Sequence, residues 1–303
     1  MAEEAARPAS PEPHGFLNVE KPRGYTSHDV VAFVRRTIRV RRVGHAGTLD
    51  PAARGVLPIC VGRATRLADE VGEGEKAYQG DVVLGIATTT DDAEGEVVAH
   101  GDTAGIDEAT VRKALDGFVG PQEQIPPAFS AVRVQGMRAY QLARRGGAVE
   151  LRPRQITIYE ARLVAWHPPV ATIFVRCSRG TYVRAIARDL GQRLGCGAHL
   201  DNLVRLAVGR FTLDDALALE EIALAAQHGY WTDLLFPPDF PLVHLPAAIV
   251  HDERAHDFRH GRAWRGPSAR GGRHRVYGEG GSFLGVAEFD PTRGVWNPRL
   301  GFV

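Results

Sequence analysis

The chain has 303 residues, of which 44% are hydrophobic and 24% charged, a composition that favours a folded, water-soluble protein over a disordered one. Its net charge of +1 does not by itself indicate a nucleic-acid partner. Residues 1–13 lack the basic start and apolar run of a signal peptide, and no later run approaches the roughly 20 apolar residues that cross a bilayer. We therefore expect a cytoplasmic protein without membrane contact, with a disordered tail over residues 1–13.

The first predicted elements are a strand, a helix and a loop. Residues 15–20 predict a short strand, and in the turn that follows it (KPRGYTS) Ser27 would cap the next helix. That helix has an apolar face and arginines near its end, where cations suit the helix dipole. Residues 44–51 (GHAGTLDP) have the composition of a loop. The chain then predicts a buried strand over residues 56–61 and a short helix over residues 64–71.

The middle of the chain alternates strands and helices irregularly. Residues 78–86 alternate apolar and polar side chains, and an acidic turn over residues 88–95 leads to a second strand, which predicts a hairpin. Hairpins in place of regular βαβ units predict an α+β fold with a mixed, mainly antiparallel sheet. The remaining predicted elements are helices over residues 107–118 and 182–194 and strands over residues 156–164 and 171–177.

A second, smaller domain is predicted at the C-terminus. Residues 236–241 contain three prolines, which disfavour helix and central strand and so predict a linker. The segment beyond it is rich in glycine and carries short β-like runs such as residues 283–287. We therefore divide the chain into a large domain over residues 14–240 and a small β-rich domain over residues 245–303.

No pattern for a metal or a cofactor is present in the sequence. Cys60, Cys177 and Cys196 are odd in number and widely spaced, which indicates neither a disulfide framework nor a zinc site. The glycine-rich signatures of nucleotide-binding loops are also missing from the sequence. We expect no cofactor and no metal, and three buried cysteines.

The small net charge hides a strong segregation of charge along the chain. Residues 35–66 contain eight arginines and one acid, Asp50, whereas residues 69–108 contain twelve acids and one base. Residues 124–149 contain no acid, and their arginines alternate with Phe129, Met137 and Tyr140. One such run would often be a solvated surface, but three together indicate an RNA partner, since cations and aromatic rings bind phosphates and exposed bases.

Asp50 is the residue most suited to chemistry in this pattern. It is the one acid of an arginine-dense stretch and lies in a loop of small residues, with Pro51 restricting its backbone. Nearby cations favour the ionised form, so the carboxylate would be available as a nucleophile at neutral pH. An Asp-Pro pair is more often an ordinary turn, and only the wider context decides between these interpretations.

That context is residues 44–58 (GHAGTLDPAARGVLP), which resemble the catalytic motif of the bacterial TruB family of pseudouridine synthases. Other matches follow in chain order at residues 21–27 (KPRGYTS), 76–78 (KAY), 180–184 (GTYVR) and 195–200 (GCGAHL), continuing to Leu203 and Leu206. The matches cover about residues 15–210, and the C-terminal part resembles the family's PUA domain in position, length and composition. The resemblance implies a pseudouridine synthase fold acting on U55 in the TΨC stem-loop of tRNA, and this isomerisation requires no cofactor.

The resemblance also implies catalytic roles. Asp50 would be the nucleophile, attacking either the ribose or C6 of the uracil, and the sequence does not decide between these routes. The target base must be flipped out of its stack to be reached. Tyr78 would pack against the flipped base and assist proton removal from C5, while Arg184 would pair with Asp50 and keep it oriented and ionised.

Further residues are implied to contact the substrate. Tyr182 and Leu203 would line the base pocket, although such residues taken singly are more often part of a core. His45 would contact the RNA and replace the flipped base in its stack, and Lys21 would support the active-site loop or contact phosphate. Residues 125–149 correspond to an RNA-binding insertion that closes over the substrate.

The implied partner is tRNA, bound by a monomer without an obligatory protein partner. Two other functions stay open: an RNA-binding or RNA-folding protein with a vestigial pocket, and a guide-RNA-dependent relative that needs protein partners. The intact set of Asp50, Tyr78 and Arg184 argues against the first. The overall length and the short C-terminal domain argue against the second.

Overall fold

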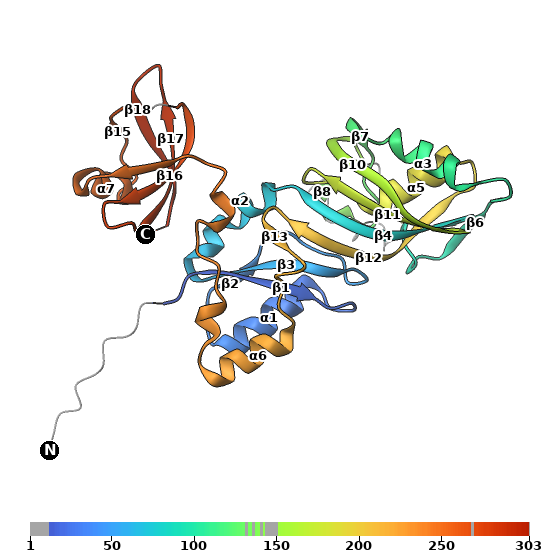
Figure 1. Ribbon diagram of the computed structural model, residues 1–303, viewed down its shortest axis with the longest axis horizontal. Helices are drawn as coiled ribbons and strands as arrows, with labels where there is room; N and C mark the ends of the chain where they lie inside the picture. The colour runs from blue at the N-terminus through green and yellow to red at the C-terminus, as the bar shows by residue number, and fades with distance from the viewer. Residues whose placement is uncertain are drawn as a thin grey trace.

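A computed structural model describes residues 12–130, 133–134, 137–139, 142, 151–267 and 270–302. The expected tail over residues 1–13 therefore lies outside the described residues except for its last two, as does most of the expected insertion over residues 125–149. Two sheets organise the described chain: a nine-stranded sheet within residues 15–212 and a five-stranded sheet within residues 247–301 (Figure 1). The fold is α+β, which confirms the predicted class.

The large sheet is mixed and mainly antiparallel. Its path is β1-β3-β12-β4-β11-β10-β7, with β2 paired to β3 and β13 to β12, and of these pairs β12–β3 is the parallel one. The apolar residues of β4 and β11 alternate with polar ones, as period-two burial requires. The bounds are β1 Gly15–Lys21, β2 Val43–His45, β3 Arg54–Val61, β4 Lys76–Leu84, β7 Gly120–Gln124, β10 Arg154–His167, β11 Val170–Cys177, β12 Ala198–Val208 and β13 Phe211–Thr212.

Two pairs of helices cover different parts of this sheet. Helices α1 (Ser27–Ile38) and α6 (Leu219–His228) share one hydrophobic core with β1 and β3. Helices α3 (Glu108–Asp116) and α5 (Val183–Arg193) share another with β4, β10 and β11. Strand β3 thus belongs to the first core and β4 to the second, and β12 lies between these two strands in the sheet (Figure 1). No helix of the described residues is long and apolar enough to cross a membrane.

The start of α1 corrects the predicted cap. Thr26, not Ser27, is the N-cap: its side chain accepts a hydrogen bond from the Asp29 amide, and the Asp29 carboxylate accepts one from the Thr26 amide. The Ser27 hydroxyl instead accepts from the Leu49 amide (2.9 Å) and donates to the Leu49 carbonyl (3.1 Å). The local pattern predicted that the Ser27 hydroxyl would cap the helix. It binds the residue before Asp50 instead.

Two other predicted elements differ in the structure. Strand β4 pairs with β11 and β12, and Gly85, at φ 85°, ends it; the hairpin begins one strand later, between β5 (Ile86–Thr88) and β6 (Val97–His100). The helix predicted over residues 64–71 is a 3-10 turn, η1 (Gly62–Leu67), followed by α2 (Ala68–Glu73). The short strands β8 (Arg133–Val134) and β9 (Met137–Arg138) form a further hairpin.

The C-terminal domain is a five-stranded sheet with one helix and its own hydrophobic core. The order is β14-β16-β17-β18-β15, built from β14 (Ala247–Val250), α7 (Asp252–Arg259), β15 (Trp264–Arg265), β16 (Gly272–Gly278), β17 (Phe283–Asp290) and β18 (Val295–Gly301).

The segment between the domains packs against both of them. After η2 (Trp231–Leu234), Phe236 exchanges two backbone hydrogen bonds with Phe16 of β1 (2.9 and 2.8 Å). The 3-10 turn η3 (Phe240–Leu242) follows, and the preceding Asp239 carboxylate accepts a 2.5 Å hydrogen bond from the Tyr277 hydroxyl in the C-terminal domain. The proline-rich segment is therefore a packed connection and not a free tether.

Candidate active site

The Asp50 loop, residues 46–53, connects β2 to β3 and is held by segments far away in the sequence. At its start the Ala46 amide donates to the Pro58 carbonyl (3.0 Å), and at its end the Pro51 carbonyl accepts from the Gly24 amide (2.8 Å). The Ser27 hydroxyl binds Leu49 between them. These contacts fix the backbone on either side of Asp50.

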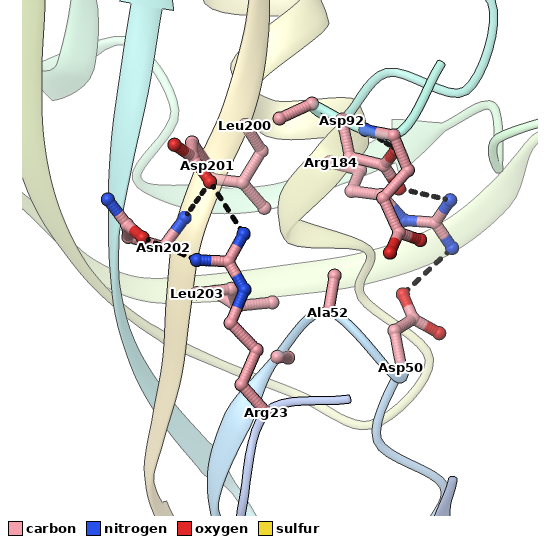
Figure 2. A pocket seen from close by; sticks show the side chains of 12 residues that line it. Arg23, Asp50, Ala52, Asp92, Arg184, Leu200, Asp201, Asn202 and Leu203 are labelled. Carbon is pink, nitrogen blue, oxygen red and sulfur yellow. Dashed lines mark hydrogen bonds and ion pairs between the residues drawn. The ribbon is translucent and has the colours of Figure 1, made fainter. Parts of the chain in front are cut away.

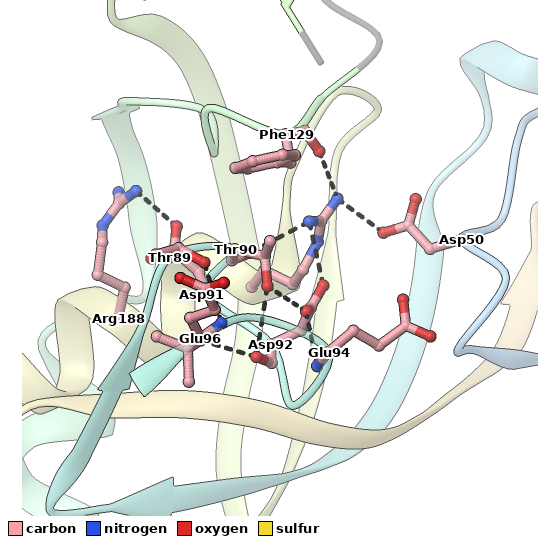
Figure 3. A network of polar contacts seen from close by, with 11 residues as sticks. Asp50, Thr89, Thr90, Asp91, Asp92, Glu94, Glu96, Phe129 and Arg188 are labelled. Atoms are coloured by element: carbon pink, nitrogen blue, oxygen red, sulfur yellow. Dashed lines mark hydrogen bonds and ion pairs between the residues drawn. The ribbon is translucent and has the colours of Figure 1, made fainter. Parts of the chain in front are cut away.

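Arg184 joins Asp50 to the rest of the site. Its guanidinium lies 2.9 Å from the Asp50 carboxylate and 3.2 Å from that of Asp92 (Figure 2). It also donates to the carbonyls of Thr90 (3.2 Å) and Phe129 (3.1 Å), and Figure 3 shows these two residues beside Asp50 and Asp92. The Arg184 side chain is 9% exposed, whereas that of Asp50 is 45% exposed. The buried arginine therefore orients a carboxylate that a substrate can still reach.

Residues from four parts of the chain line one hollow next to this ion pair. The wall is formed by the Asp50 loop, β4, the start of α5 and β12, and it includes Asp50, Tyr78, Tyr182, Arg184 and Leu203. Aromatic and apolar side chains thus face a fixed carboxylate. Such a lining suits a planar organic group that reacts with the carboxylate.

A second hollow adjoins the first and shares Asp50, Arg184 and Leu203 with it (Figure 2). It extends toward Arg23, which donates to the Asn202 side-chain oxygen at 3.0 Å and lies 3.4 Å from the Asp201 carboxylate. The two hollows together form a recess that is apolar beside Tyr78 and polar beside Arg23.

The two tyrosines of the site differ in burial: Tyr78 is buried and Tyr182 is half-buried. Burial raises the pKa of Tyr78, and the neighbouring Arg205 opposes that shift. Burial also raises the pKa of Tyr182, the N-cap residue of α5. Ionisation of either phenol is therefore even less favourable than that of a free tyrosine, which is already neutral at pH 7. Tyr182 is fixed by Gln124, whose side chain accepts from its amide (2.8 Å) and donates to its carbonyl (3.1 Å).

Lys21 is placed underneath the Asp50 loop and not on the surface of the recess. Its side chain is fully buried, and its ammonium donates to the carbonyls of Pro22 (3.0 Å), Tyr25 (2.6 Å) and Pro51 (3.3 Å). Enclosed in this way, it does not meet a phosphate. Of the two roles expected for Lys21, loop support fits its position, and the expected direct contact with substrate does not.

His45 lies at the end of β2, outside the residues that line the two hollows. Its half-buried ring packs edge-on against the exposed His28, with ring centroids 5.5 Å apart and an interplanar angle of 82°. Its Nδ1 atom has no hydrogen-bond partner among the described residues. Burial lowers the pKa of His45, and His28 and Arg205 lower it further, so the ring is neutral at pH 7.

Two parts of the site were not predicted from the sequence. The acidic turn before β6 supplies Asp91 and Asp92, which pair with Arg188 (3.0 Å) and Arg184, so its acids are partners of site arginines. Arg205 of β12 is also buried here and donates to carbonyls of the Asp50 loop. In the sequence, only the charge contrast between residues 35–66 and 69–108 could have indicated that Asp91 and Asp92 pair with site arginines. Nothing in the sequence indicated that Arg205 is buried.

The described residues contain no group of three His, Cys, Asp or Glu side chains that could hold a metal ion. Cys60, Cys177 and Cys196 are free and buried, and burial raises the pKa of Cys60 to about 12 and that of Cys177 to about 11. The Cys60 and Cys177 thiols therefore stay protonated, and none of the three cysteines lines the recess.

Family models match almost the whole of the folded chain. Residues 35–183 match the N-terminal domain of TruB family pseudouridylate synthases, residues 184–239 the C-terminal domain of tRNA pseudouridylate synthase B, and residues 246–299 the C-terminal domain of pseudouridine synthase II TruB. The tRNA pseudouridine synthase B of Symbiobacterium thermophilum is 48% identical over 262 residues, 86% of each chain. The chain belongs to the TruB family of pseudouridine synthases. The enzyme of the same name from Moorella thermoacetica is 46% identical over 292 residues, 92% of this chain and 95% of that protein.

Solved structures with lower sequence identity share the TruB-type fold. A chain of an H/ACA RNP bound to a substrate RNA containing 2′-deoxyuridine superposes with a TM-score of 0.73 at 20% identity, covering 100% of this chain and 94% of that one. A chain of a Cbf5-Nop10-Gar1 complex gives a TM-score of 0.70 at 24% identity, covering 91% and 78%. At these identities the likeness establishes the fold alone.

Proposed function

We propose that this TruB family member converts U55 in the TΨC stem-loop of tRNA to pseudouridine, with Asp50 as the nucleophile. The observation that carries the proposal is the Asp50 carboxylate, reachable from solvent yet held at 2.9 Å by the buried Arg184, in a hollow walled by Tyr78, Tyr182 and Leu203. The tRNA specificity is supported by relatives at 40–48% identity, which bear the name tRNA pseudouridine synthase B.

The proposed reaction rearranges one nucleotide without net gain or loss. The N1–C1′ bond breaks, the uracil turns, and a C5–C1′ bond forms; the C5 proton leaves and N1 takes one up. Asp50 attacks the ribose or C6 of the base, and both routes fit its position. Tyr78 packs against the base and assists proton removal from C5, while Tyr182 and Leu203 complete the pocket. Arg184 keeps Asp50 charged and oriented.

The proposed RNA contacts extend beyond the recess. His45 takes the place of the flipped base in the RNA stack, and residues 125–149 close over the bound stem-loop. The described start of this insertion is fixed to the site, since Arg184 binds the Phe129 carbonyl and Arg188 binds that of Ile125 (2.9 Å). The C-terminal domain, residues 245–303, acts as a PUA-like RNA-binding domain. Phosphate contacts make the whole interaction dependent on salt.

We also propose that the enzyme works in the cytoplasm as a monomer without protein partners. The structural neighbours in RNP assemblies are only 20–24% identical, whereas the tRNA pseudouridine synthase B of Symbiobacterium thermophilum is 48% identical. Purified protein alone should therefore modify tRNA, and light scattering should give the mass of one chain, 32.9 kDa. A requirement for an added guide RNA or protein would contradict this part of the proposal.

Tritium release from tRNA labelled at uridine C5 tests the central claim. Wild type should release tritium from a transcript with U55 and not from one with cytidine at that position. The Asp50→Asn variant keeps the size of the side chain but removes its charge, and it should bind tRNA without releasing tritium. Release by Asp50→Asn at the wild-type rate would eliminate the nucleophile assignment. Binding without release by either protein would instead favour an RNA-binding role.

A further inference from the structure

Arg205 of β12 is a charged side chain placed inside the protein without an acidic partner. It is 1% exposed, and among the described residues its guanidinium forms no ion pair with a carboxylate. A buried cation without a counter-ion loses its hydration and is retained in a fold only where its hydrogen bonds compensate for that loss. Its partners therefore indicate what it does.

Those partners are all parts of the active site. The Nε atom donates to the Val56 carbonyl of β3 (2.7 Å), and the two terminal nitrogens donate to the Thr48 (3.0 Å) and Gly47 (3.1 Å) carbonyls of the Asp50 loop. Tyr78 is the cross-strand neighbour of Arg205 in the sheet, and the guanidinium lies close enough to its phenol to oppose the rise in the pKa of Tyr78. One planar group thus contacts the loop that carries Asp50, the strand that follows it and the tyrosine that faces it.

The sheet places Arg205 for these contacts. In the β12–β4 register it lies opposite Tyr78, and in the β12–β3 register it lies opposite Gly55. A Cβ atom on Gly55 would lie 2.3 Å from the Arg205 carbonyl oxygen, and the residue has φ 109°, so glycine is required for this approach. The absence of a side chain at Gly55 lets the backbone of β12 lie directly against β3.

Arg205 and Tyr78 are direct neighbours across the sheet. A guanidinium has donors and no acceptor, so the Tyr78 oxygen can act toward Arg205 only as an acceptor. We propose that Arg205 is a positioning residue that fixes the Asp50 loop and Tyr78 relative to each other, so that the carboxylate and the phenol face the same base. This inference rests on the proposed function, because it assigns Arg205 a part in the same reaction.

If Arg205 is a positioning residue, replacing it should slow the chemical step and leave tRNA binding unchanged. A misplacement of about 1 Å caused by a change outside the reacting groups costs roughly 100-fold in rate. Arg205 does not line the recess, so substrate affinity should depend little on it. A merely structural role would instead reduce stability, and kcat at a temperature where the variant stays folded would be unchanged.

Arg205→Lys is the first test, since lysine keeps the charge but lacks the fork of donors that binds the Val56, Thr48 and Gly47 carbonyls together. Single-turnover pseudouridine formation with saturating tRNA should slow about 100-fold, while Kd for tRNA changes less than about threefold. Arg275→Lys is the matched control: Arg275 also donates to a carbonyl, that of Leu245 (3.0 Å), and to a tyrosine hydroxyl, that of Tyr277 (3.0 Å), but it lies in the C-terminal domain. It should lose stability and keep its rate.

A second variant approaches the same contact from the loop. Gly47 has φ 109°, and a Cβ there would meet no atom within 4 Å, so Gly47→Ala strains the backbone that Arg205 holds without disturbing the core. Gly47→Ala should show the same loss of rate with unchanged affinity for tRNA. It replaces Arg205→Lys as the test if Arg205→Lys shows no cooperative unfolding and is therefore not properly folded.

The proposal is overturned if folded Arg205→Lys reacts within about threefold of wild type, or if Arg275→Lys loses as much rate. It is also overturned if Arg205→Lys does not fold and Gly47→Ala reacts normally. Wild type and Asp50→Asn are measured in the same assay. An inactive wild type or an active Asp50→Asn contradicts the proposed function itself, whereas a normal Arg205→Lys beside an inactive Asp50→Asn contradicts only the role of Arg205.

Discussion

The Arg184 guanidinium lies 2.9 Å from the Asp50 carboxylate although 133 other residues separate the two along the chain, and it donates to three further acceptors. Asp92 holds it from the opposite side at 3.2 Å. The position of the proposed nucleophile therefore depends on a network that begins in the acidic turn before β6 and ends at the start of the insertion.

Replacing Arg184 by lysine should lower kcat more than it lowers affinity. Lysine retains a charge but cannot bind Asp50, Asp92 and the Phe129 carbonyl together. Loss of a charge-assisted hydrogen bond of about 1.5–3 kcal/mol corresponds to about 10- to 150-fold in rate. Arg193→Lys, at the other end of α5, should react like wild type, because Arg193 packs on Phe118 away from the recess. Equal rates for the two variants in a single-turnover assay would contradict the network.

Lys21→Met should destabilise the fold and remove part of its pH dependence. Three carbonyls lose their donor, each worth about 1–3 kcal/mol, partly offset because a buried charge is also removed. Burial lowers the pKa of Lys21 from 10.5 to about 8. Between those values the unfolded chain binds more protons than the folded one, so the contribution of Lys21 to stability increases as the pH rises.

Urea unfolding across this pH range measures the effect. The free energy of unfolding of wild type should rise relative to that of Lys21→Met from about pH 8 toward pH 10.5. Lys76, whose pKa burial also lowers to about 8, titrates in both proteins and cancels in the difference. A difference that stays constant over the range would mean that Lys21 does not titrate as a buried amine.

Apolar periodicity and capping residues act within a few positions, and these local patterns predicted the fold class, the helices α1, α3 and α5, and the strands β1, β3, β4, β6, β10, β11 and β17. The predictions were wrong where a contact between residues far apart in the sequence determines the local structure. The sequence around Ser27 predicts a helix cap, but its hydroxyl hydrogen-bonds the Leu49 backbone. β12 was not predicted because Asp201, Asn202 and Arg205 make its sequence look polar, although two neighbouring strands pair with it.

In the site, too, some residues could be predicted from the local sequence and others could not. The dense run around Asp50 resembles a family motif and could be recognised in the sequence alone. Arg205 could not, since an arginine is expected at the surface and only the assembled sheet shows it enclosed. Likewise, Gln124 belongs to an irregular segment in the sequence, and its contact with Tyr182 exists only once β7 has joined the edge of the sheet.

Gln124→Ala should weaken both the fold and the tyrosine wall of the recess. Its buried amide makes two hydrogen bonds to the Tyr182 backbone, each worth about 1 kcal/mol, so the free energy of unfolding should fall by about 2 kcal/mol. Tyr182 then loses its anchor, and kcat should fall severalfold. Gln155→Ala, which removes an exposed amide on the neighbouring β10, is the control. Loss of stability without any change in rate would remove Gln124 from the support of the site.

His45 offers a test of how the protein would fill the gap that a flipped base leaves. Burial, His28 and Arg205 lower the pKa of its ring from 6.5, so at pH 7 it contributes a neutral planar surface and no charge. His45→Phe keeps such a surface and should bind tRNA nearly as wild type does, whereas His45→Ala should raise Kd by about 5- to 150-fold, since base–aromatic stacking is worth about 1–3 kcal/mol. Below its lowered pKa the wild-type ring gains a proton and a favourable charge for RNA, which phenylalanine cannot gain.

Filter binding at constant ionic strength should therefore show equal affinities for wild type and His45→Phe at neutral pH and a wild-type advantage that develops only in acid. If His45→Phe binds as poorly as His45→Ala at pH 7, the ring acts through its nitrogen atoms and not through stacking.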